Sequence, residues 1–174
     1  MKVLLDTNII IHREASKVIN QDIGVLFNWI DRLKYEKFIH PATVEELNRN
    51  KDPQIVATMA IKIGSYNLIR NLAPTSQILQ QVSKQIDTVA NDENDTKILN
   101  EVFCDRVDIL ISEDKKIHTK ALLLGISDRV FKIEQFLEKV TAENPNLVDY
   151  KVLAVKKVDF AQVELQDNFF DSFR

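Results

Sequence analysis

The sequence predicts an α/β fold with a mostly parallel sheet, and three observations support this prediction. Short apolar runs without polar alternation recur along the chain, as expected for buried parallel strands. Longer segments with apolar residues at helical spacing lie between them, and this alternation is typical of strands joined by crossover helices. The chain has 174 residues, 45% hydrophobic and 28% charged, which suits one packed domain with a short extension.

Four segments are expected to be strands. The first, Lys2–Leu5, is short and apolar, and it ends directly before an aspartate. The others are Phe38–Ile39, Asp108–Ile111 and Val130–Phe131. The stretch from Leu68 to Ser76 leaves room for a further short strand, which the sequence does not locate.

Helices are expected between these strands, because apolar residues recur there every three or four positions. The expected helices are Val18–Lys37, Pro41–Asn50, Pro53–Leu72, Ile78–Ile86, Asp95–Phe103, Glu113–Leu124 and Ile133–Val140. Pro41 suits the first position of its helix, and Gly125 suits the position just after the helix Glu113–Leu124. Cys104 lies among inward-facing positions and is expected in the core.

A domain boundary is expected near Glu143, where Asn and Pro follow. Residues 1–143 would form the domain, and residues 144–174 an extension or a linker toward a following domain. Within the extension, Tyr150–Val158 reads as a strand or an extended arm. The end of the chain carries Phe169, Phe170 and Phe173, which are expected to be covered by a protein surface.

Composition excludes several classes of protein. The formal net charge of −3 provides no global attraction to nucleic acid. A single cysteine excludes an internal disulfide and a cysteine-based zinc site. No apolar stretch approaches the roughly 20 residues that span a bilayer, and the chain begins with a strand-like run. We therefore expect a cytoplasmic protein.

Four carboxylates are expected to meet at one edge of the sheet. Asp6 and Asp114 closely follow two expected strands, and Glu46 (or its neighbour Glu45) follows a third. Asp95 opens a crossover helix, whose first turn lies at the same edge as the carboxyl ends of the strands. Ligands bind at that edge in open parallel sheets. Clustered carboxylates repel one another, and Mg²⁺ or Mn²⁺ with oxygen ligands would neutralise them.

Four short segments together resemble the PIN-domain family, over roughly residues 1 to 140 and in the family's order. They are Leu4-Leu5-Asp6-Thr7-Asn8, Val44-Glu45-Glu46-Leu47, Asp95-Thr96-Lys97-Ile98-Leu99 and Leu110-Ile111-Ser112-Glu113-Asp114. The resemblance implies a three-layer α/β/α sandwich with a Rossmann-like sheet. It also implies a Mg²⁺- or Mn²⁺-dependent endoribonuclease like the VapC-type toxins of bacterial toxin–antitoxin pairs. The segment 52–86 is enlarged relative to those small toxins.

The resemblance assigns roles to individual residues. It implies that the catalytic, metal-binding acids are Asp6, Glu46, Asp95 and Asp114. It places three supporting polar residues near the metal: Thr7, Asn8 and Ser112. One or two ions would activate a water that attacks the RNA phosphodiester, leaving 5′-phosphate and 3′-hydroxyl ends.

Simpler interpretations exist for most of these residues. Asp114 is also a suitable cap for the following helix, and Asp92 competes with Asp95 although it is the better candidate for a plain N-cap. The basic face formed by Lys115, Lys116 and Lys120 is a candidate RNA contact, or a solvated surface. The three histidines, His12, His40 and His118, are expected to be surface or capping residues.

The tail has a second resemblance. Residues 165–173 resemble the segment that precedes a GNAT-type acetyltransferase domain in some bacterial fusions. The expected partners are therefore an RNA substrate, and an antitoxin, a fused acetyltransferase or a second copy of the chain. The alternative to a nuclease is a catalytically weak scaffold or binding module that regulates such a partner.

Overall fold

The computed structural model describes residues 1–14, 21–89 and 91–145, and it is these that we discuss. They correspond almost entirely to one unit of the chain, Met1–Asn144. The expected arm at Tyr150–Val158, the terminal phenylalanines and the acetyltransferase-like segment lie outside the described residues.

The sheet has five strands, all parallel, in the order β3-β2-β1-β4-β5. The strands are β1 (Lys2–Leu5), β2 (Glu36–Ile39), β3 (Asn67–Leu68), β4 (Ile109–Ile111) and β5 (Val130–Phe131). The chain winds outward from β1 in one direction through β3 and then in the other through β5. The point where the order reverses lies between β1 and β4, which is where open α/β sheets bind ligands.

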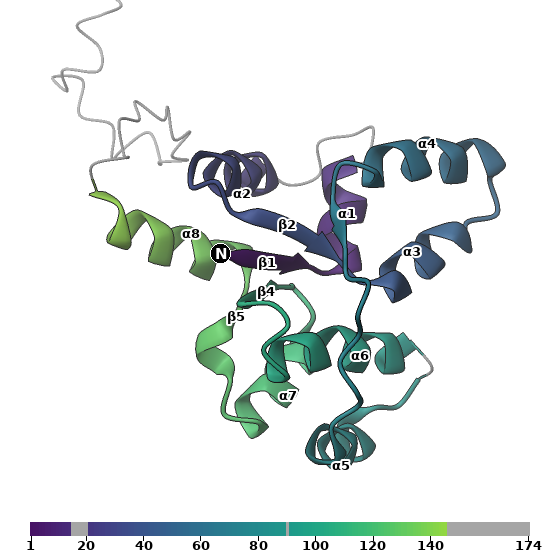
Figure 1. Cartoon of the computed structure of the whole chain (residues 1–174), viewed down its shortest axis with the longest axis vertical. Helices are drawn as coiled ribbons and strands as arrows, with labels where there is room; N and C mark the ends of the chain where they lie inside the picture. The colour runs from purple at the N-terminus through teal and green to yellow at the C-terminus, as the bar shows by residue number, and fades with distance from the viewer. Residues whose placement is uncertain (15–20, 90, 146–174) are drawn as a thin grey trace, which may run out of the picture. The chain divides into compact units, whose positions relative to one another are not determined.

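Helices cover both faces of this sheet, in the expected three-layer α/β/α arrangement (Figure 1). The helices are α1 (Thr7–Glu14), α2 (Gln21–Arg32), α3 (Pro41–Asn48), α4 (Pro53–Ile63), α5 (Gln77–Ile86), α6 (Asn91–Phe103), α7 (Lys115–Leu123), the 3₁₀ turn η1 (Ser127–Arg129) and α8 (Ile133–Glu143). One layer contains α1, α2 and α8, and the other contains α5, α6 and α7. Helix α3 packs against α1, α4 and α6.

The core explains why the strands lack polar alternation. Leu4 and Leu110 are completely buried in one cluster with Leu99 and Val102 of α6 and Ile117 of α7. Val3 and Leu5 are completely buried as well, and strand alternation turns them to the opposite face. A strand covered by helices on both faces must be apolar at every position.

Three helix boundaries differ from the prediction by several residues, and other boundaries differ by less. The helix predicted for Val18–Lys37 ends at Arg32, because Lys34 takes a left-handed φ of 55° and β2 begins at Glu36. The helix predicted to reach Leu72 ends at Ile63, with Gly64 as its C-cap. A fifth strand, β3, pairs with β2 through Phe38 and Ile39, and it shares only Leu68 with the stretch in which a further strand was considered.

The third boundary is at α6, which was predicted to open at Asp95 and instead begins at Asn91. The acidic residues Asp92, Glu93 and Asp95 are therefore inside the first turns of the helix. Asp92 and Glu93 interact favourably with the helix dipole there, which stabilises an earlier start.

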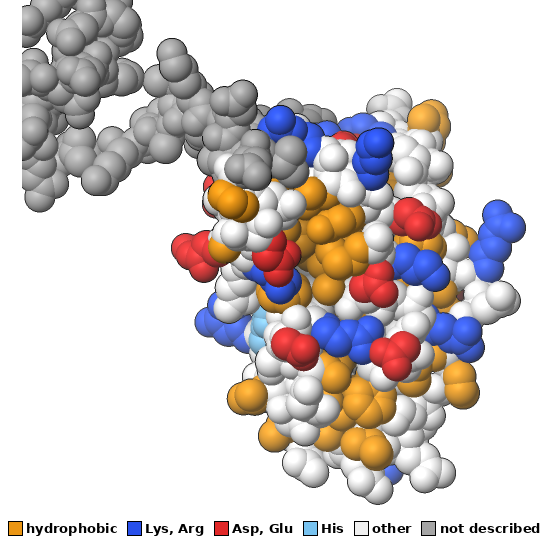
Figure 2. All heavy atoms as spheres, turned by 60° about the vertical axis from the view of Figure 1, so that its left-hand side comes forward, with side chains coloured by type: hydrophobic (Ala, Val, Ile, Leu, Met, Phe, Trp, Pro, Cys, Tyr) orange, Lys and Arg blue, Asp and Glu red, His pale blue; other side chains and the backbone are white. Residues whose placement is uncertain are grey.

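Charges of both signs are interspersed on the face shown in Figure 2, with apolar side chains between them. No surface of one sign dominates that face, in keeping with the small net charge. The most exposed apolar side chain among the described residues is Ile61 of α4, at 81%. None of the residues of α4 is buried, so this helix presents apolar groups to its surroundings.

Candidate functional site

Asp6 is buried at the carboxyl end of the central strand β1, with 1% of its surface exposed. Its backbone N–H donates to Ile111 O at 3.1 Å, which continues the ladder from β1 to β4 and places Asp6 beside Ser112. Ser112 Oγ donates to Asp6 Oδ2 at 2.6 Å, and Thr7 N donates to Asp6 Oδ1 at 2.7 Å. Sheet register and two hydrogen bonds therefore fix this carboxylate.

Thr7 connects the site to α3, which carries Glu46. The Thr7 hydroxyl donates to Thr43 Oγ1 at 3.1 Å, and both residues are buried. Thr43 lies one helical turn before Glu46, so the contact sets the position of the turn that carries this acid. Thr43 was not among the predicted site residues. The one indication in the sequence is that it precedes Glu46 by three residues, which places both on the same side of a helix. Asn8, in contrast, is exposed.

Asp114 caps α7, as the simpler interpretation proposed. Its Oδ1 accepts from the backbone N–H groups of Lys116 and Ile117, at 2.7 and 3.1 Å. Its own N–H donates to Ser112 Oγ at 3.0 Å, so one serine hydroxyl contacts both Asp6 and Asp114. Both cap bonds use Oδ1, so capping does not occupy Oδ2 and does not preclude a ligand role.

The pKa values indicate that the four acids are electrostatic neighbours. Burial raises the pKa of Asp6 to about 6, and the charges of Asp114 and Glu46 add to the increase, against the hydrogen bonds from Ser112 and Thr7. Burial likewise raises the pKa of Asp95 to about 7, and Asp6, Asp114 and Glu46 raise it further. These carboxylates from four different elements thus repel one another at one end of the sheet.

The four carboxylates are suitable ligands for a divalent cation, although their side chains do not converge on a single position. In the described part of the chain, no three His, Cys, Asp or Glu side chains come together closely enough to hold an ion as they stand. Carboxylate oxygens are nevertheless the ligands that Mg²⁺ and Mn²⁺ take in proteins.

Glu46 fits the site better than Glu45. Glu45 is exposed, whereas Glu46 is partly buried and its charge acts on both Asp6 and Asp95. Glu46 also lines a groove of about 680 Å³ between α1, α3 and α4. The apolar part of that groove is formed by Ile11, Leu47, Ile55 and Met59.

Asp92 was considered an alternative to Asp95 and the better candidate for a plain N-cap, and the structure gives it a different position from an N-cap. It lies inside α6, and its carboxylate accepts from Thr88 N and Val89 N, which precede the helix, at 2.7 and 3.0 Å. Lys116 Nζ lies 2.6 Å from Asp92 Oδ2. The Lys116 hydrogen bond and the two backbone N–H groups hold the pKa of Asp92 well below its usual range. The Asp92 carboxylate therefore connects the start of α6 to the residues before it and to Lys116 of α7.

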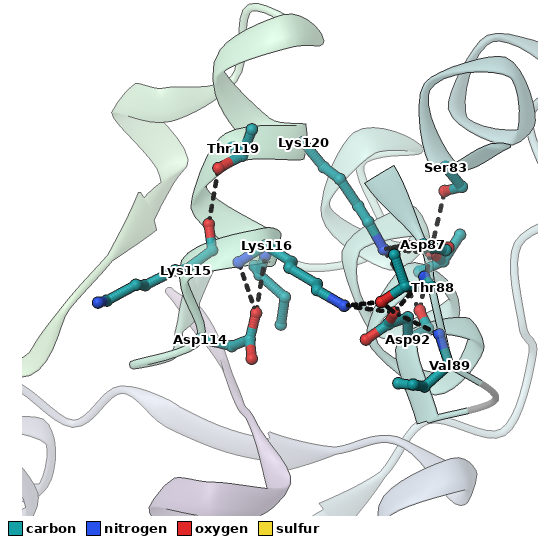
Figure 3. A network of polar contacts seen from close by, with 12 residues as sticks. Ser83, Asp87, Thr88, Val89, Asp92, Asp114, Lys115, Lys116, Thr119 and Lys120 are labelled. Atoms are coloured by element: carbon teal, nitrogen blue, oxygen red, sulfur yellow. Dashed lines mark hydrogen bonds and ion pairs between the residues drawn. The ribbon is translucent and has the colours of Figure 1, made fainter. Parts of the chain in front are cut away.

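The predicted basic face was wrong at Lys120. Lys120 is completely buried, and its ammonium contacts Asp87 and Thr96 (Figure 3). Lys116 points to the same α5–α6 corner and pairs with Asp92. Lys115 is exposed and points away from this network. Of the three lysines, it is therefore the one that remains a clear candidate for RNA contact.

The histidines and the cysteine have structural roles or exposed positions. His40 is buried, and its Nδ1 accepts from Ala42 N at 3.0 Å as the cap of α3. Burial lowers the pKa of His40 to about 4, so the ring is neutral. His118 Nε2 donates to Ser112 O at 2.8 Å, and His12 is exposed. Cys104 was predicted in the core but is partly exposed, because it lies at the end of α6.

Glu46→Gln is expected to weaken metal-dependent activity at least tenfold more than Glu45→Gln, because only Glu46 acts on the other acids. The two substitutions change the same charge on adjacent residues of one helix, so each is the other's control. Initial rates of RNA cleavage at several Mn²⁺ concentrations would measure the difference. A larger loss from Glu45→Gln would mean that the register assigned to α3 is incorrect.

Comparisons with known proteins identify the fold and no more. No family model and no curated protein matches the sequence. A chain of the VapBC2 assembly of Rickettsia felis, solved bound to a DNA fragment from their promoter, has a similar structure. It matches with a TM-score of 0.50 and 13% identity, over 76% of this chain and 98% of that one. At so low an identity, the similarity shows only that the two chains share an α/β/α architecture. No described helix is both long and apolar enough to cross a membrane.

Proposed function

We propose that this protein is a Mg²⁺- or Mn²⁺-dependent endoribonuclease of the toxin-like PIN type. The observation that supports this most directly is the position of Asp6, which is buried at the carboxyl end of β1 and linked to Asp114 through the Ser112 hydroxyl. Burial and the neighbouring acids also raise the pKa of Asp6 and of Asp95 in α6. Strongly perturbed carboxylates at the switch point of a parallel sheet are typical of a functional site. The structural likeness to a chain of VapBC2 and the sequence resemblance to PIN domains support the same class.

The residues of the site would bind the cation, orient its ligands and contact the RNA. Asp6, Glu46, Asp95 and Asp114 would hold one or two ions. Ser112 would keep Asp6 oriented through its 2.6 Å hydrogen bond, and it would orient the backbone of Asp114 through the same hydroxyl. A bound divalent ion supplies Lewis acidity, which lowers the pKa of a water nucleophile and neutralises charge on the phosphate. The exposed Lys115, next to Asp114, would bind the RNA backbone.

The test is cleavage of structured RNA, single-stranded RNA and single-stranded DNA by the purified full chain. Cleavage of RNA is expected with Mn²⁺ or Mg²⁺ and not with a chelator, because the acids need a cation to act. Products should carry 5′-phosphate and 3′-hydroxyl ends, which end-specific labelling would detect. Equal RNA cleavage in the presence of excess chelator would contradict the proposal.

A second candidate function is that of a catalytically weak binding module. It is favoured by the groove between α1, α3 and α4 and by the apolar residues that α4 exposes, among them Ile55 and Ile61. A groove of this kind beside the site suits a protein partner such as an antitoxin or a second copy of the chain. This candidate would replace the first if the wild type cleaved no RNA above the level of an Asp6→Asn preparation, yet Ile55→Arg altered its assembly in sedimentation experiments.

A further inference from the structure

Lys120 carries a charge in the interior of the protein, where an ammonium is costly unless it is fully paired. Its side chain, on α7, has no exposed surface. Its Nζ lies 2.5 Å from Asp87 Oδ1 and donates to Thr96 Oγ1 at 2.7 Å and to Asp92 O at 3.3 Å. The ammonium thus has one ion pair and two hydrogen bonds, which offset the cost of burying its charge.

The partners come from two different helices, so the ammonium connects three elements. Asp87 is the C-cap of α5, whereas Asp92 and Thr96 lie in the first turns of α6. Thr96 Oγ1 also lies 3.0 Å from Asp87 Oδ2 and 2.9 Å from Ser83 Oγ. Figure 3 shows Lys120 and Lys116 extending side by side from α7 to this corner. The α5–α6 corner is therefore held on α7 by buried polar contacts.

The same turn of α6 carries Asp95, which precedes Thr96 and lies between it and Asp92 in the chain. Thr96 and Asp92 are both held by lysines of α7, so the backbone on either side of Asp95 is fixed. Asp114 caps the first turn of that same α7. The buried contacts of Lys120 thus lie between two helices that each carry a candidate ligand, and they contribute to the relative position of Asp95 and Asp114.

We propose that Lys120 is a positioning residue of the carboxylate site, whose buried ammonium fixes the start of α6 on α7 and so holds Asp95 at the cation-binding edge. The inference rests on the proposed function only in taking Asp95 as a cation ligand. Residues that hold metal ligands in place typically change metal affinity by about 10–100-fold when they are removed. A lysine that only stabilised the fold would leave metal affinity unchanged in a folded variant.

The experiment measures Mn²⁺ affinity by titration calorimetry on the full chain, without RNA. Lys120→Met is expected to raise the Kd for Mn²⁺ about tenfold. The double variant Asp87→Asn/Lys120→Met removes both charges of the ion pair and so leaves no unpaired buried charge. If the single variant fails to fold, the Kd of this double variant tests the positioning role. Lys97→Met is the control, because Lys97 is an exposed lysine on α6 paired with Glu93, and its Kd should stay within about twofold of the wild type.

RNA cleavage then provides a second readout. The Mn²⁺ concentration for half-maximal cleavage should rise with the Kd, while the rate at saturating Mn²⁺ should return to within about threefold of the wild type. An unchanged Mn²⁺ Kd in folded Lys120→Met or in the folded double variant would overturn the positioning role. Absence of Mn²⁺ binding by the wild type would overturn the proposed metal site as well, so the two failures are distinguishable.

Discussion

Asp6→Asn and Asp114→Asn are each expected to reduce metal-dependent RNA cleavage by roughly 10²-fold or more while the fold is retained. A neutral amide is a poorer ligand for a hard cation and cannot balance its charge. The fold should survive because asparagine also caps helices well, which maintains the start of α7 at position 114. At position 6, the side-chain oxygen of asparagine can still accept one of the two present hydrogen bonds.

Single-turnover cleavage rates at saturating Mn²⁺ measure this effect, with circular dichroism as the check on folding. Asp128→Asn is the matched control, because η1 precedes β5 and so lies at the opposite edge of the parallel sheet. Its rate should equal that of the wild type within about twofold. Full activity of both Asp6→Asn and Asp114→Asn, in preparations free of other nucleases, would refute the assignment of the site.

The second large effect is on stability, and it depends on pH and metal together. The pKa of Asp6 rises from 3.8 to about 6 on folding, and that of Asp95 rises from 3.8 to about 7. Between about pH 4 and pH 7 the folded state therefore binds more protons than the unfolded state. These two acids contribute full stability below about pH 4, and that contribution is lost as pH rises through 6 to 7.

His40 acts in the opposite direction, because its pKa falls from 6.5 to about 4 on folding. Its contribution to stability is lost as pH falls through that range, so the total curve mixes both effects. The difference between the wild type and Asp6→Asn isolates Asp6, since His40 is present in both proteins. At pH 7.5 without metal, Asp6→Asn is expected to be the more stable by on the order of 2 kcal/mol, or several degrees in Tm.

Mn²⁺ should reverse that order. A cation that binds only the folded state stabilises it by roughly 2.7 kcal/mol at 100 times its Kd. Thermal melts of the wild type should therefore shift upward by several degrees with Mn²⁺ at pH 7.5, and less at pH 5, where Asp6 and Asp95 are largely protonated. Asp6→Asn should respond weakly. A wild-type melt that millimolar Mn²⁺ does not move, together with an Asp6→Asn variant less stable than the wild type, would count against any metal site.

Much of the fold could be predicted from local pattern. The apolar runs at Lys2–Leu5 and Ile109–Ile111 predicted buried parallel strands, and the structure confirmed both in the middle of the sheet. Asp6 was placed at a strand end by the same reasoning, and Asp114 at a helix start, where it is found. These predictions succeeded because burial on both faces and capping leave their marks within a few residues of the chain.

The sequence failed where a partner distant in the chain decides the outcome. Asn67–Leu68 becomes a strand because Phe38–Ile39 offers it an edge, and nothing within its own neighbourhood indicates this. Lys120 looked like part of a basic surface, yet the charge of Asp87 and the hydroxyl of Thr96 bring it into the interior. The sequence by itself determined most of the strands and helices and the acids that follow them, although it did not predict helix α1 or the position of β3. Only the tertiary structure decided which polar groups are buried together, because burying a charge is favourable only where distant segments supply its partners.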